Sequence, residues 1–150
     1  METKKIETTL VAKHSFTTTL AEVMAGKFTQ PQKLMNEVAA QGFKVHVPHI
    51  WNYIDCDGKM DSQFTLEMCI PVEKKGKDTD FIRFSELPEV KCVSHIYNGP
   101  YTEMGPVYEK LFGDLEKNKQ IPTGNCREVY LHWEMENQEK NITEIQIEVQ

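Results

Sequence analysis

The second half of the chain repeats the pattern of the first, and this internal similarity restricts the possible folds more than any other feature. Residues 11–16 (VAKHSF) align with residues 92–97 (CVSHIY) at an offset of 81. Further along, the offset is 77 and pairs Tyr53 with Tyr130. The difference of four residues is about one helical turn, an insertion that leaves the apolar stripe of a helix on nearly the same side. The sequence therefore predicts one structural unit present twice.

Apolar periodicity predicts the same order of elements in each half. Alternation of apolar and polar residues predicts strands at residues 8–16, 51–55, 64–72, 90–97, 128–133 and 142–149. Helical spacing predicts a helix after the first strand, broken or kinked at Pro31, and another after the fourth strand. Each half thus follows the order strand, helix, strand, strand. The charged connector at residues 73–88 is predicted to be a surface crossover.

Neither half is large enough to cover a sheet face alone, so both are expected to share one core. We predict a single α+β domain over residues 1–150, with repeats at about residues 6–73 and 88–150. The two repeats would form one antiparallel sheet, with helices on one face and a ligand cavity on the other.

Composition excludes several classes of function. Acidic residues outnumber basic ones by 23 to 17, a net charge of -6 that argues against nucleic acid as a direct partner. Apolar runs fall far short of the roughly 20 residues that cross a bilayer, and no signal-peptide core follows the N-terminus, so we predict a cytoplasmic protein without a membrane partner. The four cysteines are dispersed, and neither His46-x-x-His49 nor His132-x-Glu134 has a second ligand pair. We therefore predict no metal and no cofactor.

Acidic and aromatic side chains are predicted to gather on the helix-free face of the sheet. Such residues are also common on the wet face of an antiparallel sheet. Their clustering on neighbouring strands instead favours a cage for an organic cation, in which each desolvated cation–aromatic contact contributes up to about 2 kcal/mol. The candidate ligand-binding residues are Glu144, Tyr130, Tyr101, Tyr97, Tyr53, Trp51 and Glu67.

Four motifs resemble one known family. They are LPEV at residues 87–90, YNGPYTEMG at 97–105, REVYL at 127–131 and TEIQI at 143–147. Together they resemble the GyrI-like effector-binding family, whose domains form the ligand-sensing part of many AraC-type and MerR-type transcription regulators and also occur alone. The resemblance implies a duplicated fold around a ligand cavity and multidrug binding, meaning affinity for hydrophobic, often cationic, drug-like compounds.

The resemblance also implies roles for individual residues. Glu144 matches the pocket carboxylate of the family, Tyr130 its pocket tyrosine, and Tyr101 the tyrosine of its Gly-Pro-Tyr turn. Two places depart from the family pattern. Tyr97-Asn98 replaces a basic residue before that turn, and residues 132–134 (HWE) replace an Asn-Asp-Pro turn, so the rim of the pocket is expected to differ.

These observations favour a standalone module that senses or sequesters a hydrophobic or cationic small molecule. The chain contains no basic helix-turn-helix segment. Glu144 would supply the counter-charge and the aromatic residues the walls of the site.

Two alternatives stay open. One is a hydrolase of strained, cyclopropane-bearing electrophiles, in which Glu144 would act as the base beside Tyr130. The other is a protein-interaction module whose partner is DNA gyrase or a regulator, with the acidic surface as its physical basis.

Overall fold

One antiparallel sheet organises the molecule. The computed structural model describes residues 2–150, and its eight strands lie in the order β1-β6-β8-β7-β3-β4-β2-β5. All neighbouring strands are antiparallel. The α+β class with a sheet shared by both halves is therefore confirmed. The strands are β1 (Lys4–Ile6), β2 (Thr9–Thr19), β3 (His49–Ile54), β4 (Gln63–Pro71), β5 (Arg83–Leu87), β6 (Val90–Asn98), β7 (Pro122–His132) and β8 (Ile142–Val149).

The helices begin and end where the local chemistry requires. Helix α1 (Leu20–Ala25) is capped by the Thr19 side chain, which accepts a hydrogen bond from the Glu22 backbone N–H, and it ends at Gly26 with a φ of +66°. Helix α2 (Gln30–Ala40) has Pro31 in its first turn, so the stripe predicted to break at Pro31 forms two helices. Helix α3 (Gly105–Lys117) follows the 3-10 turn η1 (Tyr101–Glu103), and η2 (Gln138–Lys140) precedes β8. No helix within residues 2–150 combines the length and apolar character of a membrane span.

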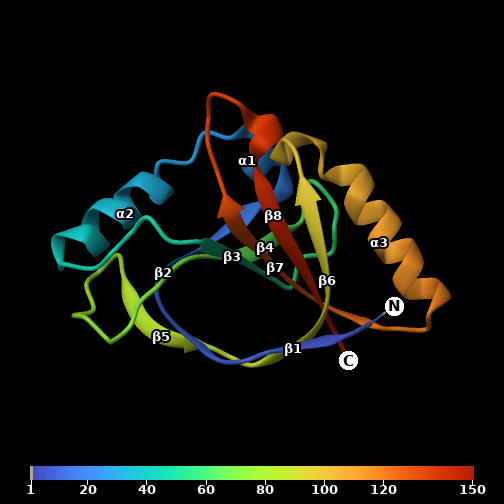
Figure 1. Ribbon diagram of the computed structural model, residues 1–150, viewed down its shortest axis with the longest axis horizontal. Coiled ribbons are helices and arrows are strands. Elements are labelled where there is room, and N and C mark those ends of the chain that lie inside the picture. The colour runs from blue at the N-terminus through green and yellow to red at the C-terminus, as the bar shows by residue number, and fades with distance from the viewer. Residues whose placement is uncertain (1) are drawn as a thin grey trace.

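One face of the sheet, here called the helix face, packs against all three α-helices. Figure 1 shows α2 and α3 on either side of the central strands, with α1 between them. Leu66 of β4 packs in the cluster under α1 and α2, and Ile145 of β8 packs in the cluster under α3. The helical residues that close these clusters are Val23, Leu34, Val38, Leu111 and Leu115.

The other face, here called the inner face, is buried without a helix. Val11, Cys69 and Leu87 form a small apolar cluster there. The edge strands β1 and β5 curl beneath the central strands, and the turn after β5 leads into β6, the neighbour of β1 (Figure 1). The curl shields the middle of the inner face, where Val11, Cys69 and Leu87 are fully or almost fully buried.

The connector at residues 73–88 differs from its prediction as a surface crossover. Its second part forms β5, which pairs with β2 along the edge of the sheet. Ile82 is fully buried and Phe84 nearly so, because both join the core under α2. The apolar residues after Asp80 thus complete the first-half core.

The two halves meet at the centre of the sheet, where β3 pairs with β7. Trp51 lies directly opposite Glu128, and Tyr53 lies opposite Cys126. The offset of 77 seen in the sequence also relates Trp51 to Glu128 and Tyr53 to Tyr130. Side chains from equivalent positions of both halves therefore converge around Glu128.

Candidate ligand-binding site

A large cavity lies on the helix face, between the central strands and helices α1 and α3. Its volume is about 1790 Å³. The cavity was expected on the helix-free face, and the structure places it on the opposite one. Its aromatic walls are Phe28, Trp51, Tyr53, Tyr101, Tyr108, Phe112, Tyr130 and Trp133, and methionines 24, 35, 60, 104 and 135 fill the gaps.

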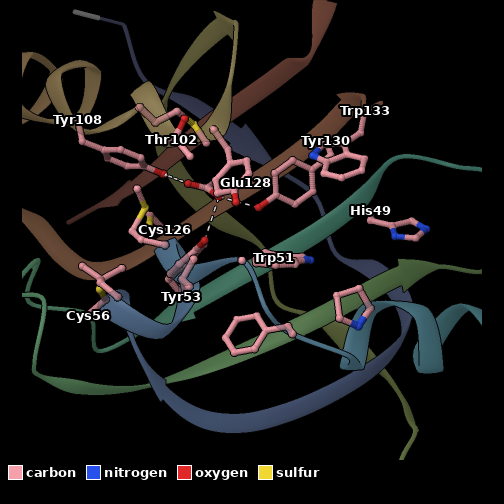
Figure 2. A pocket seen from close by; sticks show the side chains of 18 of the residues that line it. His49, Trp51, Tyr53, Cys56, Thr102, Tyr108, Cys126, Glu128, Tyr130 and Trp133 are labelled. Carbon is pink, nitrogen blue, oxygen red and sulfur yellow. Dashed lines mark hydrogen bonds between the residues drawn. The ribbon is translucent and has the colours of Figure 1, made fainter. Parts of the chain in front are cut away.

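Glu128 is the carboxylate of this cavity. Its side chain points into the space between α3 and β3 and accepts hydrogen bonds from three tyrosines (Figure 2). Tyr53 and Tyr130 donate to Oε1 at 3.0 and 2.7 Å, and Tyr108 donates to Oε2 at 2.5 Å. Burial, reinforced by the nearby Glu128 charge, raises the pKa of all three hydroxyls well above the ordinary value. The tyrosines therefore stay protonated and act as donors at neutral pH.

The Glu128 carboxylate has no basic partner within residues 2–150. Only 5% of the residue is exposed, and no lysine, arginine or histidine nitrogen of the described chain lies within 4.0 Å of its oxygens. A buried charge is costly unless it is paired or hydrogen-bonded. Here hydrogen bonds alone compensate it, so the cavity has an acid that a bound cation would neutralise.

Aromatic rings stand beside this acid. Trp51 meets Tyr130 edge to face, with ring centroids 5.6 Å apart, and Phe28 lies 6.2 Å from Trp51. At the mouth, the Tyr101 hydroxyl lies so close to Gly26 that a Cβ atom on Gly26 would be only 2.6 Å from it, too close for any side chain. The end of α1 and the η1 turn therefore approach each other closely at the mouth.

The structure brings together four of the seven predicted site residues. Tyr130, Tyr101, Tyr53 and Trp51 all line the cavity. Tyr97 does not line it, because its hydroxyl turns to donate to the Pro100 carbonyl at 2.8 Å. Glu144 and Glu67 lie on the inner face.

The prediction that Glu144 shares a face with Tyr130 is wrong. Glu144 lies on the helix-free inner face, as predicted, but Tyr130 pairs directly with Thr143 and therefore points to the helix face. On the inner face, Glu144 accepts hydrogen bonds from Lys4 and Ser94, both at 2.7 Å, and from Gln146 at 3.0 Å. The Glu144 charge is thus already paired with Lys4 and hydrogen-bonded within the protein.

Glu67 occupies the equivalent place in the first half. It accepts from Lys13 at 2.7 Å, Asn52 at 3.0 Å and Ser15 at 3.1 Å. Burial alone would raise the pKa of the Glu67 carboxyl, but the Lys13, Asn52 and Ser15 hydrogen bonds together hold that pKa below its usual value. Glu67 is therefore a charged structural group of the inner face.

Because its folded pKa is lowered, Glu67 stabilises the fold above the pKa of the unfolded chain, and this contribution is lost as the pH falls through the folded value. We expect Glu67→Gln to lower the free energy of unfolding near pH 7 by about 1 to 3 kcal/mol. Below about pH 4.3, the stability of the Glu67→Gln variant should also fall less steeply with pH than the stability of the wild type. Urea unfolding at pH values between about 7 and 3 measures both effects. The exposed Glu116→Gln is the matched control, and equal pH profiles for the two variants would contradict this role.

Sequence reasoning missed Glu128 and Tyr108. The signal for Glu128 was present, because it stands two residues before Tyr130 and alternation puts both on one face. Tyr108 recurs at helical spacing with Met104, Leu111 and Leu115 in the helix predicted after the fourth strand, and this pattern gave no sign of a ligand contact. Cys56 and Cys126 also line the wall, and burial raises the pKa of both thiols, so they are small uncharged groups. Among residues 2–150, no three potential ligands cluster closely enough to hold a metal.

A cavity with apolar walls and a few convergent polar groups is typical of domains that bind small molecules. The chain belongs to the GyrI-like small molecule binding domain family, whose family model matches residues 5–150. The resemblance found in the sequence motifs is thereby confirmed.

Solved structures share this fold. The EcmrR C-terminal domain is 23% identical with a TM-score of 0.77, and the match covers 99% of this chain and 96% of that one. EcmrR in its DNA complex is 22% identical with a TM-score of 0.81, covering 99% of this chain, which spans 56% of the EcmrR chain. SAV2435 bound to tetraphenylphosphonium is 13% identical with a TM-score of 0.68, covering 99% and 93%. No curated protein sequence gives a significant match.

Proposed function

We propose that the helix-face cavity binds hydrophobic organic cations, with Glu128 as the counter-charge. One observation carries this proposal: among aromatic rings lies a buried carboxylate that has no basic partner within residues 2–150. Glu128 takes the role that the sequence had given to Glu144. Trp51, Tyr53 and Tyr130 are proposed as ligand-binding walls.

The size and lining of the cavity favour bulky ligands over one small metabolite. Its volume of about 1790 Å³ exceeds the roughly 300 to 1,000 Å³ of ordinary ligand pockets. Methionine side chains are flexible and polarizable, so they fit ligands of different shapes. A cation beside Glu128 would also lie against the face or edge of several rings, and this favours delocalised or aryl-substituted cations.

Binding is favoured over hydrolysis by the hydrogen bonds of Glu128. A carboxylate has about four lone-pair sites, and three receive tyrosine protons. Few remain for a water that Glu128 would have to activate. Incubation with a cyclopropane-bearing electrophile, followed by mass spectrometry, tests the hydrolase alternative, and formation of the hydrated product would support it.

A role in sensing or sequestration follows from such binding. EcmrR is seen with DNA, and we propose that this domain likewise reports ligand binding to a regulator or sequesters the ligand directly. The cytoplasmic location and a partner such as DNA gyrase stay predictions from the sequence.

Calorimetry with tetraphenylphosphonium tests the proposed ligand class. The matched probe is triphenylphosphine oxide, which carries similar rings without a net charge. We expect the cation to bind at least about tenfold more tightly, because only the cation is attracted to the Glu128 charge. Equal affinities for the two probes, or no binding of either, would contradict the proposal.

A further inference from the structure

A second, smaller cavity lies on the inner face, separated from the first by the sheet. Its volume is about 300 Å³. The row of cross-strand partners Asn52, Arg127 and Gln146, on β3, β7 and β8, lines it, together with Pro88 of the β5–β6 turn and Val90 at the start of β6. The cavity is therefore built from both halves and from the segment that joins them.

Arg127 places a positive charge in this cavity, and no acidic side chain of the described residues forms an ion pair with it. Only 4% of the residue is exposed, and its Nη2 donates to the Pro88 carbonyl at 2.7 Å. Across residues 2–150, no carboxylate oxygen lies within 4.0 Å of the guanidinium. Burial lowers the pKa of the guanidinium, yet arginine stays charged in proteins. Arg127 thus has donors available for a carboxylate.

Two residues that line this cavity, Gln146 and Glu148, also carry acceptor oxygens without a hydrogen-bond partner among residues 2–150. The Oε1 of Gln146 is buried and has no hydrogen-bond partner in the described chain, and the whole residue is 5% exposed. Its orientation is fixed, because Nε2 donates to the Glu144 carboxylate at 3.0 Å, a contact that an amide oxygen could not replace. Glu148 is also free to accept, since Thr123 engages only its Oε2, at 3.0 Å.

The remaining charges of this cavity cancel each other. Lys13 and Glu67 form an ion pair at 2.7 Å. Arg127 and Glu148 are then the charges left for a ligand. A simple anion would meet Glu148, and a simple cation would meet Arg127, so neither suits the site.

We infer that the inner-face cavity binds a small zwitterion of the α-amino acid class. The ligand carboxylate would accept from Arg127, and its ammonium group would donate to Gln146 Oε1 and Glu148. This site is distinct from the proposed cation site, because Arg127, Gln146 and Glu148 point to the opposite face of the sheet from Glu128, although Asn125 and Cys126 line both cavities.

Calorimetry of the full chain with each proteinogenic L-amino acid tests this inference. We expect at least one amino acid to bind at least about tenfold more tightly than acetate or methylammonium, which carry only half of the ligand chemistry. Binding of none of the amino acids would overturn the inference. Equal binding of acetate or methylammonium would also overturn it.

Variants locate the site. Gln146→Met and Arg127→Met should each weaken amino acid binding about tenfold or more. Gln120→Met is the control, because Gln120 Oε1 is also buried and has no partner among residues 2–150, but Gln120 lines neither cavity. Circular dichroism checks folding, and Gln146→Met decides alone if the arginine variant does not fold. Unchanged binding in Gln146→Met, or an equal loss in Gln120→Met, would overturn the assignment.

Discussion

Replacing Glu128 with glutamine is expected to weaken tetraphenylphosphonium binding by about tenfold to a few hundredfold. The substitution keeps the volume of the side chain and an oxygen that accepts from the tyrosines, but it removes the negative charge. Interactions with a charged group in a buried site contribute roughly 1.5 to 3 kcal/mol. The loss should appear in the dissociation constant measured by calorimetry, while triphenylphosphine oxide binding changes little.

Glu144→Gln is the matched control for this experiment. Glu144 is also a partly buried glutamate, but it lies on the inner face and is paired with Lys4 at 2.7 Å. Its substitution should leave tetraphenylphosphonium affinity unchanged. An equal loss in both variants would indicate a general effect of charge, and a loss in Glu144→Gln alone would contradict the placement of the site on the helix face.

The strands were predictable because their signal is local. Apolar alternation located β8 at residues 142–149 and found most of β2, β3, β4 and β6, but only the C-terminal half of β7. The edge strands β1 and β5 were missed. β1 has only three residues, and the charges before β5 concealed that Ile82 and Phe84 belong to the core. Short edge strands carry too few alternations to be recognised.

The face of the site was not predictable by the same reasoning. Tyrosine and tryptophan have both apolar and polar parts, and grouping Trp51 and Tyr53 with polar residues separated them from Leu66 and Met68, their actual neighbours. A buried glutamate such as Glu128 also departs from the rule that charged residues lie on the surface. The register of β7 and β8 also shifts between Tyr130 and His132, and such irregularities follow from tertiary packing. The sequence showed which residue types form the site, but the neighbours of each side chain depended on the pairing register of the strands.

Leu115→Ala is expected to lower the free energy of unfolding by about 2 to 5 kcal/mol, because it would leave a void in a packed core. Leu115 is a fully buried residue of α3 that faces the sheet, where it packs with Ile145 and Ile147. Urea unfolding followed by circular dichroism measures the change. The control is Phe112→Ala on the same helix. Phe112 is 43% exposed at the cation cavity, where its ring stacks on Tyr108, and its loss should cost less, about 1 kcal/mol.

The two substitutions should affect tetraphenylphosphonium binding in the opposite order, with Phe112→Ala having the larger effect. Leu115 does not line the cation cavity, so Leu115→Ala should keep tetraphenylphosphonium affinity wherever the protein remains folded. Phe112→Ala removes a ring from the cavity mouth and should weaken the cation measurably while leaving the fold stable. Leu115 and Phe112 of α3 would then have separate roles, the first in the core and the second at the ligand. Equal destabilisation by both substitutions would show that the mouth of the cavity is part of the core and would contradict that division.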